Sequence, residues 1–329
     1  MLKLRYLFEN YDLAREALTH WAHDEASLDE ALGWYRISSN AIYPYFNNGE
    51  ICFLRLSPVP EKLERNLRGE LEFLDYLAAN DYPAPRAIPA SDGGTLMTLR
   101  TQWGDYYASA FTCGPGTQLE DVELTEPILH AYGLALGMLH ALSSRYVPTV
   151  RKWNEQDALH WVEAALREYH APEAVVNRLA FVRDALAKLP RTAANYGLVH
   201  YDFEPDNVLY REDTQTCGAI DFEDGMYHWY ALDIEQAFGE LADMLDEARL
   251  PAAKEAFLSG YREAFPLSND DQRTLPLMRE FVDLFGYARI LRSVSDTFDD
   301  EPDWMVELRA KQNTRIQAYE ARGLRPLDS

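Results

Sequence analysis

The stretch between residues 197 and 224 constrains the fold more than any other part of this 329-residue chain. Short apolar runs alternate there with acidic and turn-forming residues, whereas the segments on either side have the three- and four-residue apolar spacing of helices. Asp202, Asn207 and Asp221 stand close to the ends of these short runs. Rigid strands can direct the side chains at their ends to one point, so we expect these three residues to lie together.

Asn207 and Asp221 are residue types that a magnesium ion prefers. Mg²⁺ is a hard cation that binds oxygen, and in proteins it often takes only one or two side-chain ligands and completes its shell with phosphates and water. The two residues supply that number of ligands. The sequence therefore predicts a Mg²⁺ site beside Asp202.

The order and spacing of these residues resemble the signature of the aminoglycoside phosphotransferase and choline kinase family. That signature is His-x-Asp, four residues, Asn, and a later apolar-Asp-aromatic triplet, and it is matched by His200, Asp202, Asn207 and residues 220–222. The spacing also parallels the catalytic loop and metal-binding Asp of protein kinases. The resemblance implies that ATP is the cofactor, that Asp202 is the catalytic base for a substrate hydroxyl, and that Asn207 and Asp221 hold Mg²⁺.

The resemblance extends toward the start of the chain. In this family a basic residue on the third strand contacts the nucleotide phosphates and pairs with a Glu on the next helix. Arg55 stands at that position, where the family often has Lys, and Glu70 is the matching partner. Pro83-Ala84-Pro85 repeats the Pro-x-Pro that follows this helix in the family. Arg can hold phosphate through its planar fork, so both Arg55 and Glu70 are predicted to serve nucleotide binding.

Two further segments are predicted to contact the nucleotide. Ser38, Ser39 and Asn40 lie where the phosphate-covering turn of the family is expected, although the chain has no G-x-G-x-x-G motif there. A later strand resembles the strand and hinge that receive adenine through backbone hydrogen bonds. Thr112 and Cys113 are the predicted contact positions in that hinge.

The fold that the resemblance implies is α+β and bilobal, like that of protein kinases. Aromatic and branched residues predict strands at 33–38, 41–46, 51–56, 95–99 and 106–112. Leucine spacing predicts a helix from Glu61 to Asn80, and the pattern beyond the Cys-Gly-Pro-Gly break at 113–116 is mainly helical, at 125–142, 155–169, 172–189 and in four more segments after Tyr230. We expect a small N-lobe over residues 1–112, with an antiparallel sheet and one helix, and a larger, mostly helical C-lobe over 113–329.

Composition narrows the range of partners and locations. A net charge of -23 opposes binding to a polyanion, so we expect no nucleic-acid partner. The three cysteines occur singly, without a C-x-x-C pair, which fits a reducing cytoplasm rather than a disulfide framework or a zinc site. The most apolar stretch, 131–142, is too short to span a bilayer, so no membrane insertion is expected. The oligomeric state stays open.

Four acidic residues flank the predicted base and metal ligands: Glu204, Asp206, Glu223 and Asp224. If two of these carboxylates remain uncompensated, they attract a cation, and the expected acceptor is a small molecule such as an amine-bearing alcohol or an aminoglycoside. The alternative is that the side chains point into water and the acceptor is neutral. A later residue, Asp233, resembles the family's support for the catalytic-loop backbone and is interpreted as structural.

Several alternatives stay open at this point. Asp202 and Asn207 are also residues that turns use, and Glu70 shares its helix with other glutamates, as on a solvated face. A protein Ser/Thr kinase of the same fold is a second enzyme hypothesis, which the lack of an Ala-Pro-Glu segment after Asp221 disfavours. A nucleotide-binding pseudokinase is the third, motivated by Arg55 and the missing glycine loop. The motifs of serine hydrolases, zinc proteases, P-loop proteins and dinucleotide-binding dehydrogenases are absent.

Overall fold

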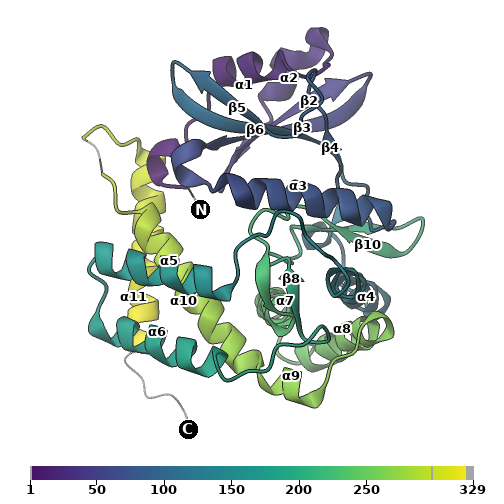
Figure 1. The fold of residues 1–329 in the computed structure, drawn as a ribbon, viewed down its shortest axis with the longest axis vertical. Coiled ribbons are helices and arrows are strands. Elements are labelled where there is room, and N and C mark those ends of the chain that lie inside the picture. Colours follow the sequence, from purple (N-terminus) through teal and green to yellow (C-terminus); the bar gives the residue numbers. More distant parts are fainter. Residues whose placement is uncertain (1, 298, 324–329) are drawn as a thin grey trace.

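Aromatic and branched residues in the first third of the chain form one antiparallel sheet, drawn at the top of Figure 1. The computed structural model describes residues 2–297 and 299–323, and within them the sheet has the strand order β1-β2-β3-β6-β4, with β5 also paired to β6. The strands are β1 (Arg36–Ile37), β2 (Ala41–Asn47), β3 (Glu50–Pro58), β4 (Ala87–Ile88), β5 (Met97–Thr101) and β6 (Gly104–Thr112). The strand predicted at 33–38 shrinks to the two residues of β1.

The turn between β2 and β3 shows how the sequence sets the register of this sheet. Asn48 and Gly49 both have positive φ, 52° and 78°, as a two-residue hairpin turn requires, and these residue types adopt it at low cost. The side chain of Asp24 accepts hydrogen bonds from both backbone N–H groups, at 3.0 and 2.8 Å. The turn thereby fixes the strand that carries Arg55.

Different helices cover the two faces of the sheet (Figure 1). The helices α1 (Tyr11–Leu18) and α2 (Leu28–Leu32) share one hydrophobic core with the strands. The helix α3 (Glu64–Ala79) lies between the sheet and the rest of the molecule, and Phe73, Leu74 and Leu77 belong to the larger core of the helical part. α3 begins at Glu64 rather than at the predicted Glu61, because the preceding residues form a separate 3-10 turn that contains a proline.

Helices make up most of the chain after β6. They are α4 (Glu126–Ser143), α5 (Glu155–Glu168), α6 (Glu173–Leu186), α7 (Ala231–Met244), α8 (Leu250–Ala264), α9 (Asn269–Arg273), α10 (Leu275–Ser293) and α11 (Asp303–Gly323). The first three lie close to their predicted bounds. After Tyr230 the described part of the chain contains five helices rather than the four predicted, because a capping box between Ser268 and Asp271 starts the short α9 just before α10.

Two small antiparallel sheets interrupt these helices and carry the polar residues noted in the sequence. β8 (Tyr196–Val199) pairs with β11 (Met226–Trp229), and β9 (Val208–Arg211) pairs with both β7 (Thr117–Gln118) and β10 (Thr216–Ala219). The predicted α+β architecture, with a small sheet lobe and a larger helical lobe, is confirmed. In residues 2–297 and 299–323, no helix is both long and apolar enough to cross a membrane.

Candidate active site

Asp202 and Asn207 lie together on the loop that joins β8 to β9. The Asn207 side-chain amide donates to the Asp202 backbone carbonyl at 3.0 Å and to its carboxylate Oδ2 at 2.9 Å. Burial raises the pKa of Asp202 well above its ordinary value, and Glu204 and Asp224 raise it further, while Arg289 opposes them. A carboxylate that is oriented by one oxygen and holds a proton readily is suited to accept the proton of a hydroxyl group.

His200 links this loop to the residue that precedes Asp221. The Asp202 backbone N–H donates to His200 Nδ1 at 3.2 Å, so the ring proton lies on Nε2, which donates to the Ile220 carbonyl at 2.9 Å. Burial lowers the pKa of His200 to about 4, which keeps the ring neutral at physiological pH. The side chain is therefore a scaffold for the loop, in agreement with the interpretation that the base is Asp202.

Asp233 stabilises the same loop through hydrogen bonds to its backbone. Its carboxylate accepts the backbone N–H groups of His200 at 2.7 Å and Tyr201 at 2.8 Å. His140 Nε2 lies 3.0 Å from Asp233, and His140 Nδ1 lies 2.8 Å from the hydroxyl of Tyr261. The geometry agrees with the structural role expected for Asp233. The role of His140 could not be inferred from the sequence, because its partners are far away along the chain and become neighbours only in the folded core.

Asp221 and Asn207 are joined through the backbone and present free oxygens. The Ile220 N–H donates to the Asn207 carbonyl at 2.9 Å, and Asp221 follows with a positive φ of 61°. Among the described residues, neither the Asp221 carboxylate nor the Asn207 Oδ1 has a hydrogen-bond partner or an ion pair. Asp221 is exposed to solvent, yet surrounding protein raises its pKa by desolvation, and Glu223 raises it further. Two unpartnered oxygen donors, one of them an anion held in place by its backbone, fit a hard cation such as Mg²⁺.

Arg55 and Glu70 form a buried ion pair between β3 and α3. The two guanidinium nitrogens Nη1 and Nη2 donate to the two carboxylate oxygens at 2.8 and 2.7 Å, and the side chains are only 4% and 2% exposed. The guanidinium also lies over the ring of Phe111, 4.7 Å from its centre. Burial would lower the pKa of Arg55, but Glu70 raises it above its ordinary value. The structure brings the two residues together as the resemblance implies.

Replacing Glu70 by Gln should destabilise the protein strongly, because it leaves the Arg55 charge buried without its counter-ion. A loss of about 3 kcal/mol in the free energy of unfolding is expected, measured by urea denaturation. Glu64→Gln is the matched control on the same helix, since Glu64 pairs with Arg68 in an exposed i,i+4 geometry that contributes about 0.5 kcal/mol. Equally small losses in both variants would show that Arg55 does not depend on Glu70.

The remaining predicted nucleotide contacts differ in how free they are. The Asn40 side chain is buried, accepts from Ser57 Oγ at 2.7 Å and donates to Glu223, so its polar atoms are already engaged within the protein. The Thr112 N–H is already bonded to the Arg86 carbonyl at 2.9 Å. Cys113 is exposed, and none of the hydrogen bonds between described residues engages its backbone N–H. The Ser38 N–H is bonded to the Asn40 carbonyl at 3.0 Å, which leaves its side chain for a phosphate contact.

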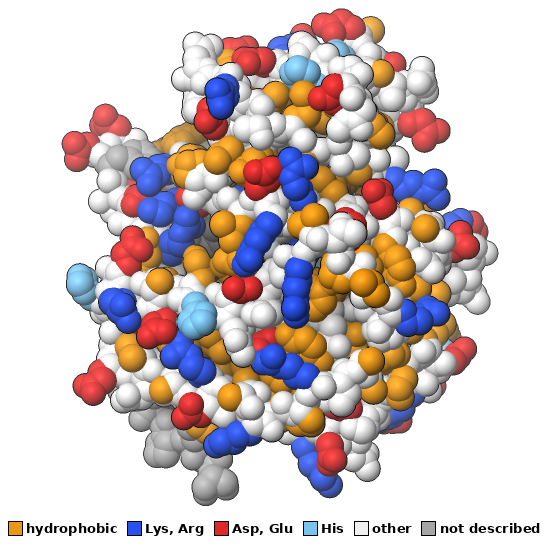
Figure 2. Space-filling model, viewed as in Figure 1, with side chains coloured by type: hydrophobic (Ala, Val, Ile, Leu, Met, Phe, Trp, Pro, Cys, Tyr) orange, Lys and Arg blue, Asp and Glu red, His pale blue; other side chains and the backbone are white. Residues whose placement is uncertain are grey.

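The four acidic residues around the site are largely neutralised, contrary to expectation. Glu223 pairs with Lys62, Asp224 with Arg289 at 2.6 Å, and Asp206 with Arg36 at 3.5 Å. Among the described residues only Glu204 of the four has no cation partner; burial, with Glu240 and Asp206, raises its pKa to about 7. The expectation of two uncompensated carboxylates is wrong, because its partners come from distant segments. On the face in Figure 2, acidic and basic side chains are likewise interspersed.

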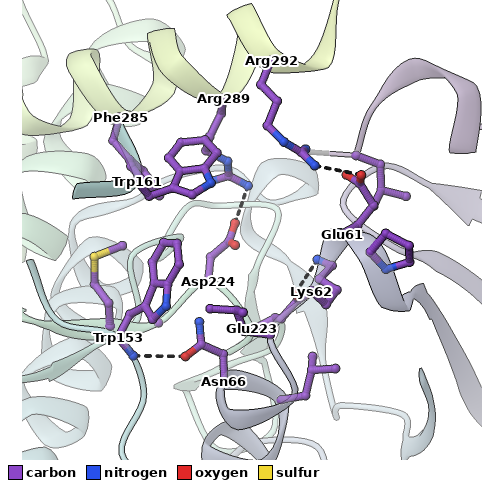
Figure 3. Close-up of a pocket in the computed structure, with 16 residues that line it drawn as sticks. Glu61, Lys62, Asn66, Trp153, Trp161, Glu223, Asp224, Phe285, Arg289 and Arg292 are labelled. Atoms are coloured by element: carbon purple, nitrogen blue, oxygen red, sulfur yellow. Dashed lines mark hydrogen bonds and ion pairs between the residues drawn. The ribbon is translucent and has the colours of Figure 1, made fainter. Parts of the chain in front are cut away.

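A cavity of about 260 Å³ opens beside Asp224 (Figure 3). Three aromatic side chains form one part of its wall: Trp153, Trp161 and Phe285. Asn66 and three ion pairs, of Glu223 with Lys62, Asp224 with Arg289 and Glu61 with Arg292, give it a polar lining as well. Sequence reasoning missed this cavity, because its walls come from segments far apart in the chain: α3, α5, α10, the connections before α3 and before α5, and the loop after Asp221.

Comparison with known proteins agrees with this geometry. The model of the phosphotransferase enzyme family matches residues 47–277. Amicoumacin kinase of Bacillus subtilis is 25% identical over 231 residues, 64% of this chain and 66% of that protein. Homoserine kinase of Caulobacter vibrioides is 28% identical over 225 residues, 65% of this chain and 68% of that protein. The matches span about two thirds of the length of these relatives.

Two solved structures share the fold over nearly the whole chain. An amicoumacin kinase in complex with AMP-PNP, Ca²⁺ and Ami superposes with a TM-score of 0.77 at 17% identity, covering 99% of this chain and 97% of that one. A microcompartment-associated aminopropanol kinase superposes with a TM-score of 0.69 at 22% identity, covering 96% and 99%. At these identities the likeness establishes the fold, which is that of the kinase-like phosphotransferases.

The chain belongs to the phosphotransferase enzyme family, whose model covers more than half of it. The predicted family, the predicted kinase-like fold and the enzyme class, a phosphotransferase whose relatives act on small molecules, are confirmed. The assignment of individual residues to base, metal and nucleotide is a separate question and stays a prediction.

Proposed function

We propose that this protein transfers the γ-phosphoryl group of ATP to a hydroxyl group of a small molecule and that it requires Mg²⁺. One observation carries the proposal: hydrogen bonds of Asn207 hold Asp202 and the segment of Asp221 close together. Asn207 bonds the Asp202 carboxylate through its side chain and the Asp221 segment through its backbone, yet both predicted metal-binding oxygens stay free. If Asn207 and Asp221 only capped turns, their side-chain oxygens would accept hydrogen bonds from backbone N–H groups. The described residues make no such hydrogen bond to these oxygens.

In the proposed reaction Asp202 accepts the proton of the acceptor hydroxyl. The oxygen then forms a bond to the γ-phosphorus as the bond from that phosphorus to the β–γ bridging oxygen breaks, and ADP leaves. Asn207 keeps the Asp202 carboxylate oriented through its 2.9 Å hydrogen bond, so the base does not have to reorganise during the reaction. Mg²⁺ held by Asn207 and Asp221 would neutralise charge that develops on the phosphates.

The nucleotide is proposed to bind between the sheet and the helical lobe. Arg55, fixed by Glu70, would contact phosphate, Ser38 and Ser39 would cover the phosphates, and Cys113 would meet adenine through its backbone. We place the boundary between the lobes after β6. We also propose a cytoplasmic location, supported by the free state of the cysteines at 52, 113 and 217.

The acceptor is proposed to occupy the cavity beside Asp224. The cavity joins an aromatic wall to three ion pairs, so it suits a compact molecule with both apolar and polar groups. An amine-bearing alcohol remains the proposed acceptor because the relatives include an aminopropanol kinase and homoserine kinases. The charge of the site no longer supports that choice, since its carboxylates are mostly paired.

A protein substrate is disfavoured by the segment after Asp221. β11 begins at Met226 and α7 at Ala231, so the chain returns directly to the core and leaves no long loop to hold a polypeptide. A pseudokinase is disfavoured by the free oxygens of Asn207 and Asp221.

The test is ATP consumption with a panel of hydroxyl compounds, followed by mass spectrometry of the product. The panel contains aminopropanol, homoserine, choline, several aminoglycosides and neutral sugars, each with and without EDTA. We expect at least one small alcohol to gain the mass of a phosphoryl group, and EDTA to stop the reaction. Nucleotide binding without turnover of any compound would favour the pseudokinase, and phosphorylation of a protein such as casein alone would favour the protein kinase.

A further inference from the structure

Lys152 is a buried lysine that none of the functions above uses. It lies in the connection between α4 and α5, and its side chain is only 3% exposed. The ammonium nitrogen donates to the backbone carbonyls of Phe222 at 2.8 Å and Glu223 at 2.7 Å. Among the described residues it makes no ion pair within 4 Å. Burying an unpaired ammonium costs free energy, so these two carbonyls are the contacts that hold it there.

The segment that carries Lys152 is fastened to α3. Glu72 of α3 accepts the backbone N–H of Thr149 at 2.6 Å and that of Val150 at 2.9 Å. Asn66, one turn and a half earlier on α3, accepts the backbone N–H of Trp153 at 3.1 Å. The segment therefore has little freedom to move relative to α3, and the Lys152 side chain extends from a backbone whose position is fixed.

Gly69 allows the segment to lie directly against α3. A Cβ atom at this position would come within 2.6 Å of Lys152 Cγ and 2.9 Å of the Val150 carbonyl oxygen, closer than such atoms approach in proteins. The next residue is Glu70, which holds Arg55. The stem of Lys152 thus passes beside the turn of α3 that carries Glu70.

Lys152 contacts the part of the metal loop that most needs support. Asp221 has a positive φ of 61°, a conformation that non-glycine residues rarely adopt and that costs of order 1 kcal/mol or more. Such a backbone persists when surrounding contacts fix it. The carbonyls of the two residues that follow Asp221 point at one ammonium group, which fixes the direction in which the chain leaves Asp221. Burial lowers the pKa of Lys152, and the nearby Glu70 and Glu223 carboxylates offset that effect only in part.

We propose that Lys152 is a positioning residue for the metal site: it clamps the backbone after Asp221 to α3 and so sets the affinity of the nucleotide complex for its metal ion. The proposal rests on the proposed function for the role of Asp221. Lys152 itself touches neither metal nor substrate in this arrangement. Its effect passes through the position of the Asp221 carboxylate relative to Arg55 and Glu70.

The experiment measures Mn²⁺ binding to the complex of the protein with ADP, from the electron paramagnetic resonance signal of free Mn²⁺. Lys152→Met keeps the unbranched shape of the side chain, one atom shorter, and removes its charge and donors. We expect it to weaken Mn²⁺ binding by about 10-fold or more, the usual loss when a residue that orients a metal ligand is removed. Arg151→Met is the control, because it removes the same charge from the neighbouring, exposed residue, whose guanidinium lies over Tyr227. It should leave Mn²⁺ binding unchanged.

A second pair of variants tests the clamp without removing the charge. Gly69→Ala pushes Lys152 away from α3 and should also weaken Mn²⁺ binding, whereas Gly286→Ala on α10, where an added Cβ meets nothing within 4 Å, should not. Turnover in rising Mg²⁺ gives an independent readout: the kcat of Lys152→Met should recover at high Mg²⁺, which a merely misfolded variant would not do. Normal Mn²⁺ affinity in whichever of Lys152→Met and Gly69→Ala folds would overturn the proposal and leave Lys152 a structural residue. If wild-type protein with ADP does not bind Mn²⁺ at all, the proposed function fails first.

Discussion

Replacement of Asp221 by Ala is expected to lower kcat for phosphoryl transfer by about 10³-fold or more, because a bound metal contributes several kcal/mol of charge stabilisation in the transition state. The carboxylate has no hydrogen bond or ion pair among the described residues, so its removal should cost little stability. The measurement is steady-state turnover of ATP with the best acceptor of the panel, together with a thermal melt. Asp221→Asn, which tolerates a positive φ better than Ala does, separates loss of charge from backbone strain.

Asp213 offers a matched control for this variant. It is an exposed Asp in the hairpin between β9 and β10, on the same segment of chain, and it pairs with Arg211. Asp213→Ala should keep normal turnover. Near-normal ATP consumption in Asp221→Ala would remove Asp221 from the metal site and with it the central element of the proposed function.

Replacement of Asp202 by Asn should act on a different step. We expect kcat to fall by about 10²-fold or more, the usual contribution of a general base, while the dissociation constant for ATP stays within a factor of about two. An Asn side chain has nearly the same shape and can still accept the hydrogen bond from Asn207, but it cannot take up a proton. Single-turnover kinetics and nucleotide titration measure the two quantities separately.

The pH profile supplies a further check on Asp202. Its pKa is raised by burial and by neighbouring carboxylates, so wild-type kcat should fall toward acid pH as this group becomes protonated and can no longer accept a proton. The residual activity of Asp202→Asn should lack that acid limb. A variant that binds ATP much more weakly yet keeps its kcat would place Asp202 in nucleotide binding instead.

Residues that are close along the chain, or joined by regular structure, could be predicted from the sequence. Asp202 and Asn207 share one loop, and the hydrogen bond between their side chains spans only five residues. Arg55 and Glu70 are fifteen residues apart, on a strand and the helix that follows it, so the register of two regular elements sufficed to pair them. For this reason the proximity of the residues within each of these two pairs could be inferred from the sequence.

Charge compensation and the cavity could not be predicted, because they depend on contacts between distant segments. Lys62 meets Glu223 across 161 positions of sequence, and Arg289 meets Asp224 across 65. The sequence around the site is acidic, but basic side chains from distant segments neutralise most of these carboxylates. No local sequence pattern predicts these contacts. The contact of Asn40 has the same character, because its side chain bonds Glu223, 183 positions away along the chain.

The packing of α3 determines how the two halves of the molecule can part. In the sequence this helix belongs to the first 112 residues, which include the sheet. Its residues Phe73, Leu74 and Leu77 are nevertheless part of the core of the helical half. Just beyond the helix, the Pro83 carbonyl accepts a hydrogen bond from the Ala219 N–H at 3.0 Å. Within the described residues, the sheet shares a second, separate core with α1 and α2, to which α3 contributes no residue. A hinge motion that admits ATP should therefore move the sheet, with α1 and α2, relative to α3 and the helical part. The salt bridge between Arg55 on β3 and Glu70 on α3 connects these two parts. Such a motion would have to rotate the Arg55–Glu70 pair or separate it, so we expect the strength of this pair to affect the rate of ADP release.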